Sequence, residues 1–186
     1  MTIRATAPRL TTPVTGQDHV LGPKTARVTL VEYGDYECPR CGEAHPIVKS
    51  LQQLLAGQLR FAFRHFPLAT VHPHAQHAAE AAEAAGVQRK FWQMHDVLFG
   101  YQDALEDDDL LQYAAALGLN LRRFTTELAS HFHAPRVRED FLSGARSGVN
   151  GTPTFFINGV RHDGGYDLRA LQDAIECAAK LSYGES

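Results

Sequence analysis

Two short stretches of the chain, residues 27–33 and 59–66, alternate apolar and polar side chains. A half-buried strand has this pattern because its successive side chains point to opposite faces of a sheet. Between the two stretches, about residues 39–55 place apolar side chains three and four positions apart, and Gly57 follows. This spacing predicts an amphipathic helix with a C-terminal cap. The first third of the chain therefore predicts a strand, a helix and a second strand.

Helical spacing of apolar residues continues through most of residues 74–147. Glycines, Asn120 and Pro135 divide this region into predicted helices, at about residues 75–85, 91–99, 110–117, 120–130 and 135–147. Apolar and aromatic stripes at this spacing are more typical of a core than of a cofactor site. We interpret the region as a helical insertion in a smaller α/β core.

Residues 148–186 return to a strand pattern and then to a helical one. An apolar run at 154–157 precedes Asn158-Gly159, a strong signal for a two-residue hairpin turn, and a second short strand follows at 160–162. Asp167 is placed to cap a final amphipathic helix. Cys177 lies near the edge of the apolar face of that helix, where we expect a buried small hydrophobic residue.

Length and charge limit the class of protein. A chain of 186 residues suits one domain with an insertion, and its net charge of −3 argues against a nucleic-acid partner. No stretch is apolar and long enough to predict a membrane span or a secretory signal. We therefore expect a cytoplasmic location if Met1 is the true start, and the bacterial envelope if it is not. Residues 1–15 lack periodicity and predict a flexible arm.

Cys38 and Cys41 lie three positions apart at the predicted junction between the first strand and the helix. A helix N-terminus has unpaired N–H groups and positive dipole charge, which stabilise a thiolate. This placement predicts thiol–disulfide exchange, with Cys38 as the exposed nucleophile and Cys41 as the resolving thiol. The alternative is half of a structural zinc site, but the only other cysteine is Cys177 and no second close pair follows.

Glu32 lies on the same strand face as Val28 and Leu30. A carboxylate in this position either reaches water at the end of the strand or has a use in the interior. Beside the dithiol, a partly buried acid could take and return the proton that Cys41 must exchange. We therefore treat Glu32 as a candidate catalytic residue.

Several histidines occur in close groups, but their spacing does not match a closed metal site. His72, His74 and His77 are interrupted by Pro73, and the pair at positions 131 and 133 flanks Phe132. We expect surface or helix-capping roles for these residues. No metal site is predicted.

The order of elements, with Cys-Pro-Arg-Cys at the first strand-to-helix junction and Gly-Thr-Pro-Thr before the hairpin, resembles the DsbA-like thiol–disulfide oxidoreductases. Glu32 lies six residues before Cys38, where these families place a buried acid, and Pro46 lies where thioredoxins have a kink proline. The resemblance implies an α/β thioredoxin fold, a mixed sheet flanked by helices, with an inserted all-helical subdomain. The core would comprise residues 16–71 and 148–182, and the insertion residues 72–147.

The resemblance also implies the parts of an active site. The Thr152-Pro153 bond would be cis and pack against the dithiol, where Thr152 could pair with an extended substrate. Pro39 suits the first helical turn. Arg40 stands where DsbA-like enzymes more often carry His, and its charge should lower the pKa of Cys38.

The implied partners are protein thiols or disulfides and a redox-recycling partner, with no cofactor beyond a redox-active Cys38–Cys41 disulfide. Whether the natural direction is oxidation, reduction or isomerisation is left open by the sequence. Two alternatives remain. A glutathione-dependent transferase or isomerase of the same fold would keep activity in Cys41→Ser. A non-catalytic redox sensor or chaperone would bind partners without turnover.

Overall fold

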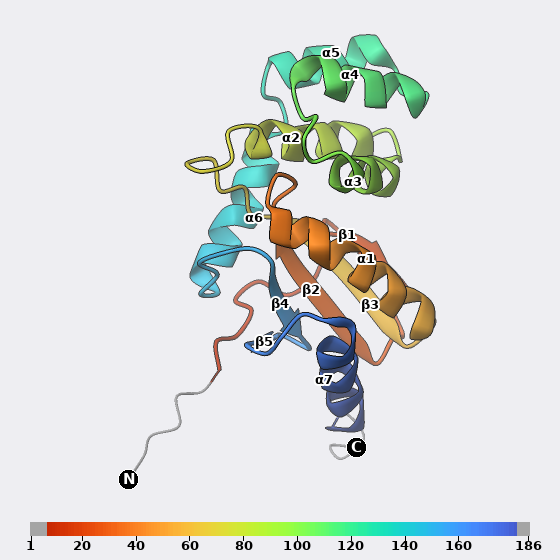
Figure 1. The fold of residues 1–186 in the computed structure, drawn as a ribbon, viewed down its shortest axis with the longest axis vertical. Helices are drawn as coiled ribbons and strands as arrows, with labels where there is room; N and C mark the ends of the chain where they lie inside the picture. The colour runs from red at the N-terminus through yellow and green to blue at the C-terminus, as the bar shows by residue number, and fades with distance from the viewer. Residues whose placement is uncertain (1–6, 182–186) are drawn as a thin grey trace.

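A mixed sheet of five strands lies at the centre of the computed structural model, which describes residues 7–181 (Figure 1). The strands are β1 (His19–Leu21), β2 (Val28–Gly34), β3 (Leu59–His65), β4 (Thr154–Ile157) and β5 (Val160–His162). Their order across the sheet is β1-β3-β2-β4-β5. Only β2 and β3 are parallel, while the other neighbours are antiparallel. The two strands predicted at residues 27–33 and 59–66 and the hairpin of β4 and β5 are confirmed.

Helices cover both faces of this sheet. They are α1 (Pro39–Leu54), α2 (Ala75–Gly86), α3 (Phe91–Gly100), α4 (Asp107–Ala116), α5 (Leu121–Ala129), α6 (Ala134–Arg146) and α7 (Leu168–Leu181). Helices α1 and α7 lie on one face (Figure 1), and α6 packs against the other face, next to Tyr33 and Phe66. Val28 and Leu30 point into the larger core, whereas Val31 and Tyr33 belong to a smaller cluster on the opposite face. This alternation buries both faces of β2.

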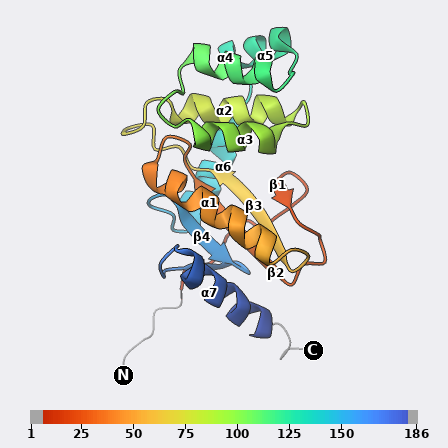
Figure 2. The same ribbon diagram turned by 45° about the vertical axis from the view of Figure 1, so that its right-hand side comes forward.

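The helical insertion lies between β3 and β4 in the chain and at one end of the sheet in space. Helices α2 and α3 pack beside each other next to the N-terminal half of α1, and α4 and α5 form the layer beyond them (Figure 2). The main apolar core runs without a break from the sheet into this insertion. The fold is therefore the α/β thioredoxin fold that the sequence resemblance implies. Its exact domain boundaries stay a prediction.

Gly144 allows α6 to approach the sheet closely. A Cβ atom at this position would lie 2.8 Å from Phe66 and 2.9 Å from Tyr33. Directly beside it, the hydroxyl groups of Tyr33 and Ser143 are 2.7 Å apart in a buried hydrogen bond. A larger residue at 144 would separate the helix from β2.

Two expectations from the sequence are wrong. Cys177 is exposed rather than buried, because it lines an open surface pocket between α7 and the hairpin of β4 and β5. The expectation of a flexible arm fails for residues 9–14: Arg9 forms an antiparallel bridge with Val160, and Leu10 donates a hydrogen bond of 2.9 Å to the carbonyl of Gly159. Residues 1–6 of the predicted arm lie outside the described residues. None of the described helices has the length and apolar content needed to cross a membrane.

A buried arginine fastens the N-terminal segment to the sheet. Arg64 on β3 donates to both carboxylate oxygens of Asp18, at 2.7 and 3.2 Å, and both side chains are almost fully buried. Its guanidinium also donates to the carbonyls of Thr12 and Pro13 and to the Tyr33 hydroxyl, at 2.9 to 3.0 Å. Most donors of the fork are therefore satisfied.

Removing this arginine should destabilise the fold strongly. We expect Arg64→Ala to lower the free energy of unfolding by about 3–5 kcal/mol, because Asp18 is left buried without its partner. Urea denaturation of the purified protein measures the change. The matched control is Arg169→Ala, which removes an exposed ion pair with Asp173 and should leave stability unchanged. Equal effects in the two variants would contradict this role of Arg64.

Candidate active site

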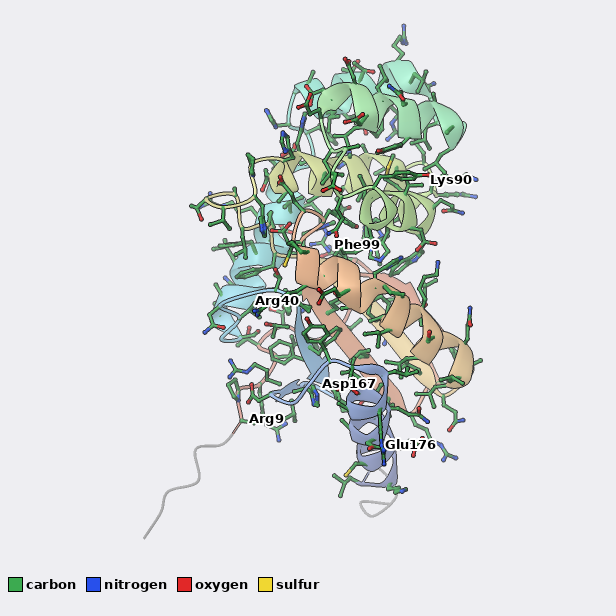
Figure 3. The ribbon with its side chains drawn as sticks, viewed as in Figure 1. Arg9, Arg40, Lys90, Phe99, Asp167 and Glu176 are labelled. Carbon is green, nitrogen blue, oxygen red and sulfur yellow. The ribbon has the colours of Figure 1, made fainter. Side chains whose placement is uncertain are left out.

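Cys38 is the N-cap residue of α1, four residues after the end of β2. Its backbone is extended, with φ −74° and ψ 119°, and Pro39 begins the helix, where a missing N–H is no loss. Figure 3 shows Arg40 at this end of the helix. The carbonyl of Cys38 accepts hydrogen bonds from the N–H groups of Cys41 and Gly42, at 3.0 and 3.1 Å. The helix therefore starts at the dithiol, as predicted.

The Cys38 thiol is strongly acidic. Hydrogen bonding with the Cys41 side chain lowers its pKa most; burial opposes this, and the N–H groups of Cys41 and Arg40 lower it further, to about 5. From the sequence, we expect the charge of Arg40 to lower the pKa of Cys38. In the structure, the main contribution of Arg40 to this pKa comes from its backbone N–H group. At neutral pH Cys38 is consequently a thiolate, the form that reacts with disulfides.

Cys41 and Glu32 are kept in the opposite state. Both are buried, with Cys41 0% and Glu32 2% exposed. Burial, reinforced by the neighbouring Cys38 charge, raises the pKa of Glu32 to about 8. Burial also raises the pKa of Cys41 well above its ordinary value, and Glu32 adds to this through its charge. Cys38 is itself only 6% exposed, so the expectation of an exposed nucleophile is wrong. The site therefore joins one nearly buried thiolate to a protonated thiol and a protonated carboxyl group that lie deeper.

The loop before β4 closes the site on the other side. The Thr152-Pro153 peptide bond is cis, as the resemblance implies. The Cys38 thiol lies 3.5 Å from the carbonyl oxygen of Thr152, which joins the two predicted parts of the site directly. The Thr152 hydroxyl is buried and has no hydrogen-bond partner among residues 7–181. The predicted residues Glu32, Cys38, Cys41, Thr152 and Pro153 thus come from β2, α1 and one loop to a single place.

Asp35 holds the loop between β2 and Cys38, a role that the sequence analysis misses. Its buried carboxylate accepts hydrogen bonds from the N–H groups of Glu37 and Leu68, both at 2.8 Å, and contacts Nδ1 of His72 at 2.8 Å. Burial opposes a charge on His72, but its contact with Asp35 raises its pKa overall. An aspartate accepting from the N–H two residues later is a recognisable turn signal, whereas its contacts across the fold are not visible in the sequence.

Gln102, which follows α3, connects the helical insertion to the dithiol. Its side-chain amide donates to the carbonyls of Tyr36 and Cys38, at 2.8 and 2.9 Å. Gly42 makes room for it, since a Cβ atom there would lie 1.9 Å from the Gln102 amide oxygen. No sequence spacing links positions 42 and 102, so sequence reasoning could not find this contact.

A cleft of about 460 Å³ opens beside the start of α1, between the dithiol loop and the insertion. Its lining residues are Glu37, Pro39, His72, His74, Gln102, Asp103, Leu105 and Glu106. Two groups of side chains with metal-ligand chemistry lie elsewhere, His45 with His95 and Asp96, and His65 with Glu83 and Asp140. Neither of these groups, found among the described residues, includes Cys38 or Cys41.

The chain is similar in sequence to known proteins and to one family profile. A profile of the family described as Thioredoxin matches residues 14–177. An Na(+)/H(+) antiporter NhaA 1 from Salinispora arenicola is 52% identical over 162 residues, which are 87% of this chain and 25% of the relative. An NhaA antiporter from Herminiimonas arsenicoxydans is 42% identical over 88% of this chain and 26% of its own length. The chain therefore spans about a quarter of the length of these curated relatives.

Solved structures agree over the whole fold. BdbD from Bacillus subtilis superposes with a TM-score of 0.82 at 25% identity, over 95% of this chain and 98% of that one. A thioredoxin-like oxidoreductase from Silicibacter pomeroyi gives a TM-score of 0.79 at 28% identity, over 89% of this chain and 94% of that one. Wolbachia pipientis alpha-DsbA1, at 23% identity and a TM-score of 0.79, covers 97% of this chain and 99% of its own and has the same fold.

The acidity of Cys38 can be measured directly. We expect the ultraviolet absorbance of the reduced protein to rise with a midpoint near pH 5, because the pKa of Cys38 is about 5. The step should vanish in Cys38→Ser and persist in Cys177→Ser, the matched control for an exposed thiol. A single rise at the alkaline pKa of free cysteine, about 8.5, would contradict the geometry described.

Proposed function

Because the chain belongs to the thioredoxin family and its neighbours in structure are DsbA-like thiol–disulfide oxidoreductases, we propose that it exchanges disulfides with protein substrates through Cys38 and Cys41. The observation that supports this best is the thiolate of Cys38, at the start of α1 and 3.5 Å from the Thr152 carbonyl. A buried thiol of normal acidity would react poorly.

The proposed reaction transfers two electrons from substrate to enzyme. A substrate thiolate attacks Sγ of Cys38 in the Cys38–Cys41 disulfide, a mixed disulfide forms, and Cys41 leaves and takes a proton. A second substrate thiolate then attacks the substrate sulfur, and Cys38 leaves as a thiolate. The substrate gains a disulfide and the enzyme becomes the dithiol. The low pKa of Cys38 makes it a good leaving group in the second step.

Glu32 is proposed to handle the proton of Cys41. With a pKa near 8 it is protonated at neutral pH, so it can donate a proton when Cys41 leaves as a thiolate and recover it in the reverse step. Its Oε1 atom is buried and has no hydrogen-bond partner. The acid is thus held ready without a competing acceptor.

Substrates are proposed to be held through their main chain beside Thr152 and Pro153. The cis bond directs the backbone of this loop toward Cys38, and main-chain pairing recognises an extended segment with little regard to its sequence. The cleft beside Pro39 leaves room for the substrate chain on the insertion side. This arrangement suits unfolded or partly folded protein thiols, and a separate redox partner would recycle the dithiol.

The acidity of Cys38 favours the oxidising direction. At pH 7, a thiolate with a pKa of about 5 stabilises the reduced form by about 3 kcal/mol relative to an ordinary thiol, which corresponds to about 60 mV. A stabilised reduced form accepts electrons more readily. We therefore propose an oxidase or isomerase rather than a thioredoxin-like reductase.

A second candidate function rests on the curated relatives. In these relatives the matched region is about a quarter of a chain named as an Na(+)/H(+) antiporter. The same dithiol could therefore act as a non-catalytic redox sensor that changes the state of a transport partner. Such a sensor would bind its partner stoichiometrically and would not turn over disulfide substrates.

Single cysteine variants test the exchange mechanism. Cys38→Ser and Cys41→Ser should each abolish oxidation of a reduced, unfolded substrate protein, because neither variant can form the Cys38–Cys41 disulfide. With a disulfide-bonded substrate, Cys41→Ser should accumulate a mixed disulfide, visible by non-reducing electrophoresis and mass spectrometry, because the Cys38 thiolate attacks the substrate disulfide and no Cys41 thiol remains to displace the substrate. Cys177→Ser is the matched control with normal turnover. Equal accumulation of the mixed disulfide in the Cys38 and Cys41 variants would contradict the assigned roles, and a wild type without turnover would favour the sensor.

Equilibration with glutathione tests the direction. We expect the Cys38–Cys41 pair to have a potential clearly more oxidising than the about −270 mV of thioredoxin, because its thiolate is more stable. The fraction of oxidised protein is measured by mass spectrometry after rapid alkylation. A value at or below that of thioredoxin would instead support a reductase.

A further inference from the structure

His45, His95 and Asp96 form a cluster where α1 meets α3. His45 lies on α1, one turn beyond Cys41, and the other two residues are neighbours on α3. One ligand atom from each lies within 4.8 Å of the other two. The two helices run beside each other in both views (Figures 1 and 2), and Phe99 of α3 stacks on the His45 ring (Figure 3). Two packed helices therefore hold the cluster.

His95 is placed as a metal ligand with an orienting partner. It is 3% exposed, and its Nδ1 lies 3.0 Å from the hydroxyl of Tyr36. No hydrogen bond from the described residues occupies its Nε2. Together with His45 and Asp96 it lines a small cavity of about 50 Å³ that leads to the surface. Metal-bound imidazoles commonly fix their second nitrogen in this way.

In the second group, which consists of His65, Glu83 and Asp140, protein partners already contact ligand atoms of each residue. His65 Nε2 lies 2.9 Å from Glu83, and the two oxygens of Asp140 accept hydrogen bonds from Arg136 and from the backbone of His65. These contacts form a closed ion-pair network. His65 also keeps an unpaired nitrogen, Nδ1, among the described residues, but all three members of its group are buried. The cluster around His95 differs because its cavity leads to solvent.

We propose that His45, His95 and Asp96 form a binding site for a divalent transition-metal ion of the zinc class. Two imidazoles and one carboxylate suit such an ion, and a three-residue set leaves a position open to water. The sequence analysis predicts no metal site, since position 45 is separated from 95 and 96 by fifty residues and the sequence spacing gives no signal. Closure onto an ion requires a small inward movement, because zinc ligands lie about 2.0–2.2 Å from the metal.

A metal ion in this site would compete with Lys49 for the carboxylate of Asp96. His45 Nε2 lies 3.3 Å from one Asp96 oxygen, while Lys49 Nζ binds the other at 2.5 Å. Lys49 is 45% exposed and free to turn toward water when a cation enters. Its ammonium group therefore takes the position beside Asp96 that a bound metal cation would occupy.

Bound metal would reach the dithiol through Tyr36. This residue lies two positions before Cys38, contacts His95 through its hydroxyl, and has its carbonyl bound by Gln102. Fixing His95 therefore restrains the loop that carries Cys38. The site joins the insertion to the redox centre without touching a reacting sulfur.

The test uses the full chain in its disulfide form with Cys177→Ser, so that no thiol can ligate metal. Calorimetric titration with Zn²⁺ should show one site per chain, and Co²⁺ should give visible bands without a sulfur charge-transfer band. We expect His45→Ala and Asp96→Asn each to weaken Zn²⁺ binding at least about tenfold, and Tyr36→Phe to weaken it about 10–100-fold through the orienting contact. Lys49→Ala should strengthen binding because the competing charge is gone.

His77→Ala is the matched control, since His77 also pairs with an aspartate, Asp107, but lies outside the cluster. Its affinity for Zn²⁺ should equal that of the parent. Absence of Zn²⁺ binding, unchanged affinity in His45→Ala, or weaker binding in Lys49→Ala would each overturn the proposal. Circular dichroism of every variant shows that a loss of binding is not a loss of fold, and none of these outcomes depends on disulfide turnover.

Discussion

The start of α1 is the constraint on which the site depends. The chain must pass from the end of β2 into a helix within four residues, and this places the N–H groups of Arg40 and Cys41 where they stabilise the Cys38 anion. Asp35 fixes the turn from the sheet side and Gln102 from the insertion side. With both ends of the loop fixed, the Cys38 sulfur stays where these donors act. Its acidity is a property of this junction rather than of cysteine.

The two sulfurs differ because they lie at different depths. One helical turn carries Cys41 into the core, close to the carboxyl group of Glu32, whose Oε1 atom has no hydrogen-bond partner among the described residues. Low polarity keeps both interior groups protonated, while the outer thiol ionises. A single short motif thus yields a nucleophile and a proton-holding partner, provided that the strand below it supplies an acid at position 32.

Much of this arrangement could be predicted from the sequence. Periodicity located the strands, the hairpin turn at Asn158 and most helix ends, because these depend on neighbours along the chain. The dithiol and Glu32 followed from their position relative to those elements. Contacts made only by folding could not be predicted: Gln102 reaches Cys38 across sixty-four positions, and Arg9 joins a strand at the opposite end of the chain. Cys177 was misplaced because a residue at the edge of an apolar face lies near the boundary between core and solvent.

The N-terminal segment also has a consequence for the sheet as a whole. Arg9 and Leu10 run along the outer side of the β5 hairpin, and Arg161 donates a backbone hydrogen bond to the carbonyl of Pro8. An uncovered edge strand is a template for joining other chains into a growing sheet. A protein proposed to handle unfolded polypeptides meets many such chains. Because its own backbone covers this edge, fewer unpaired groups remain there to which another chain could add a strand.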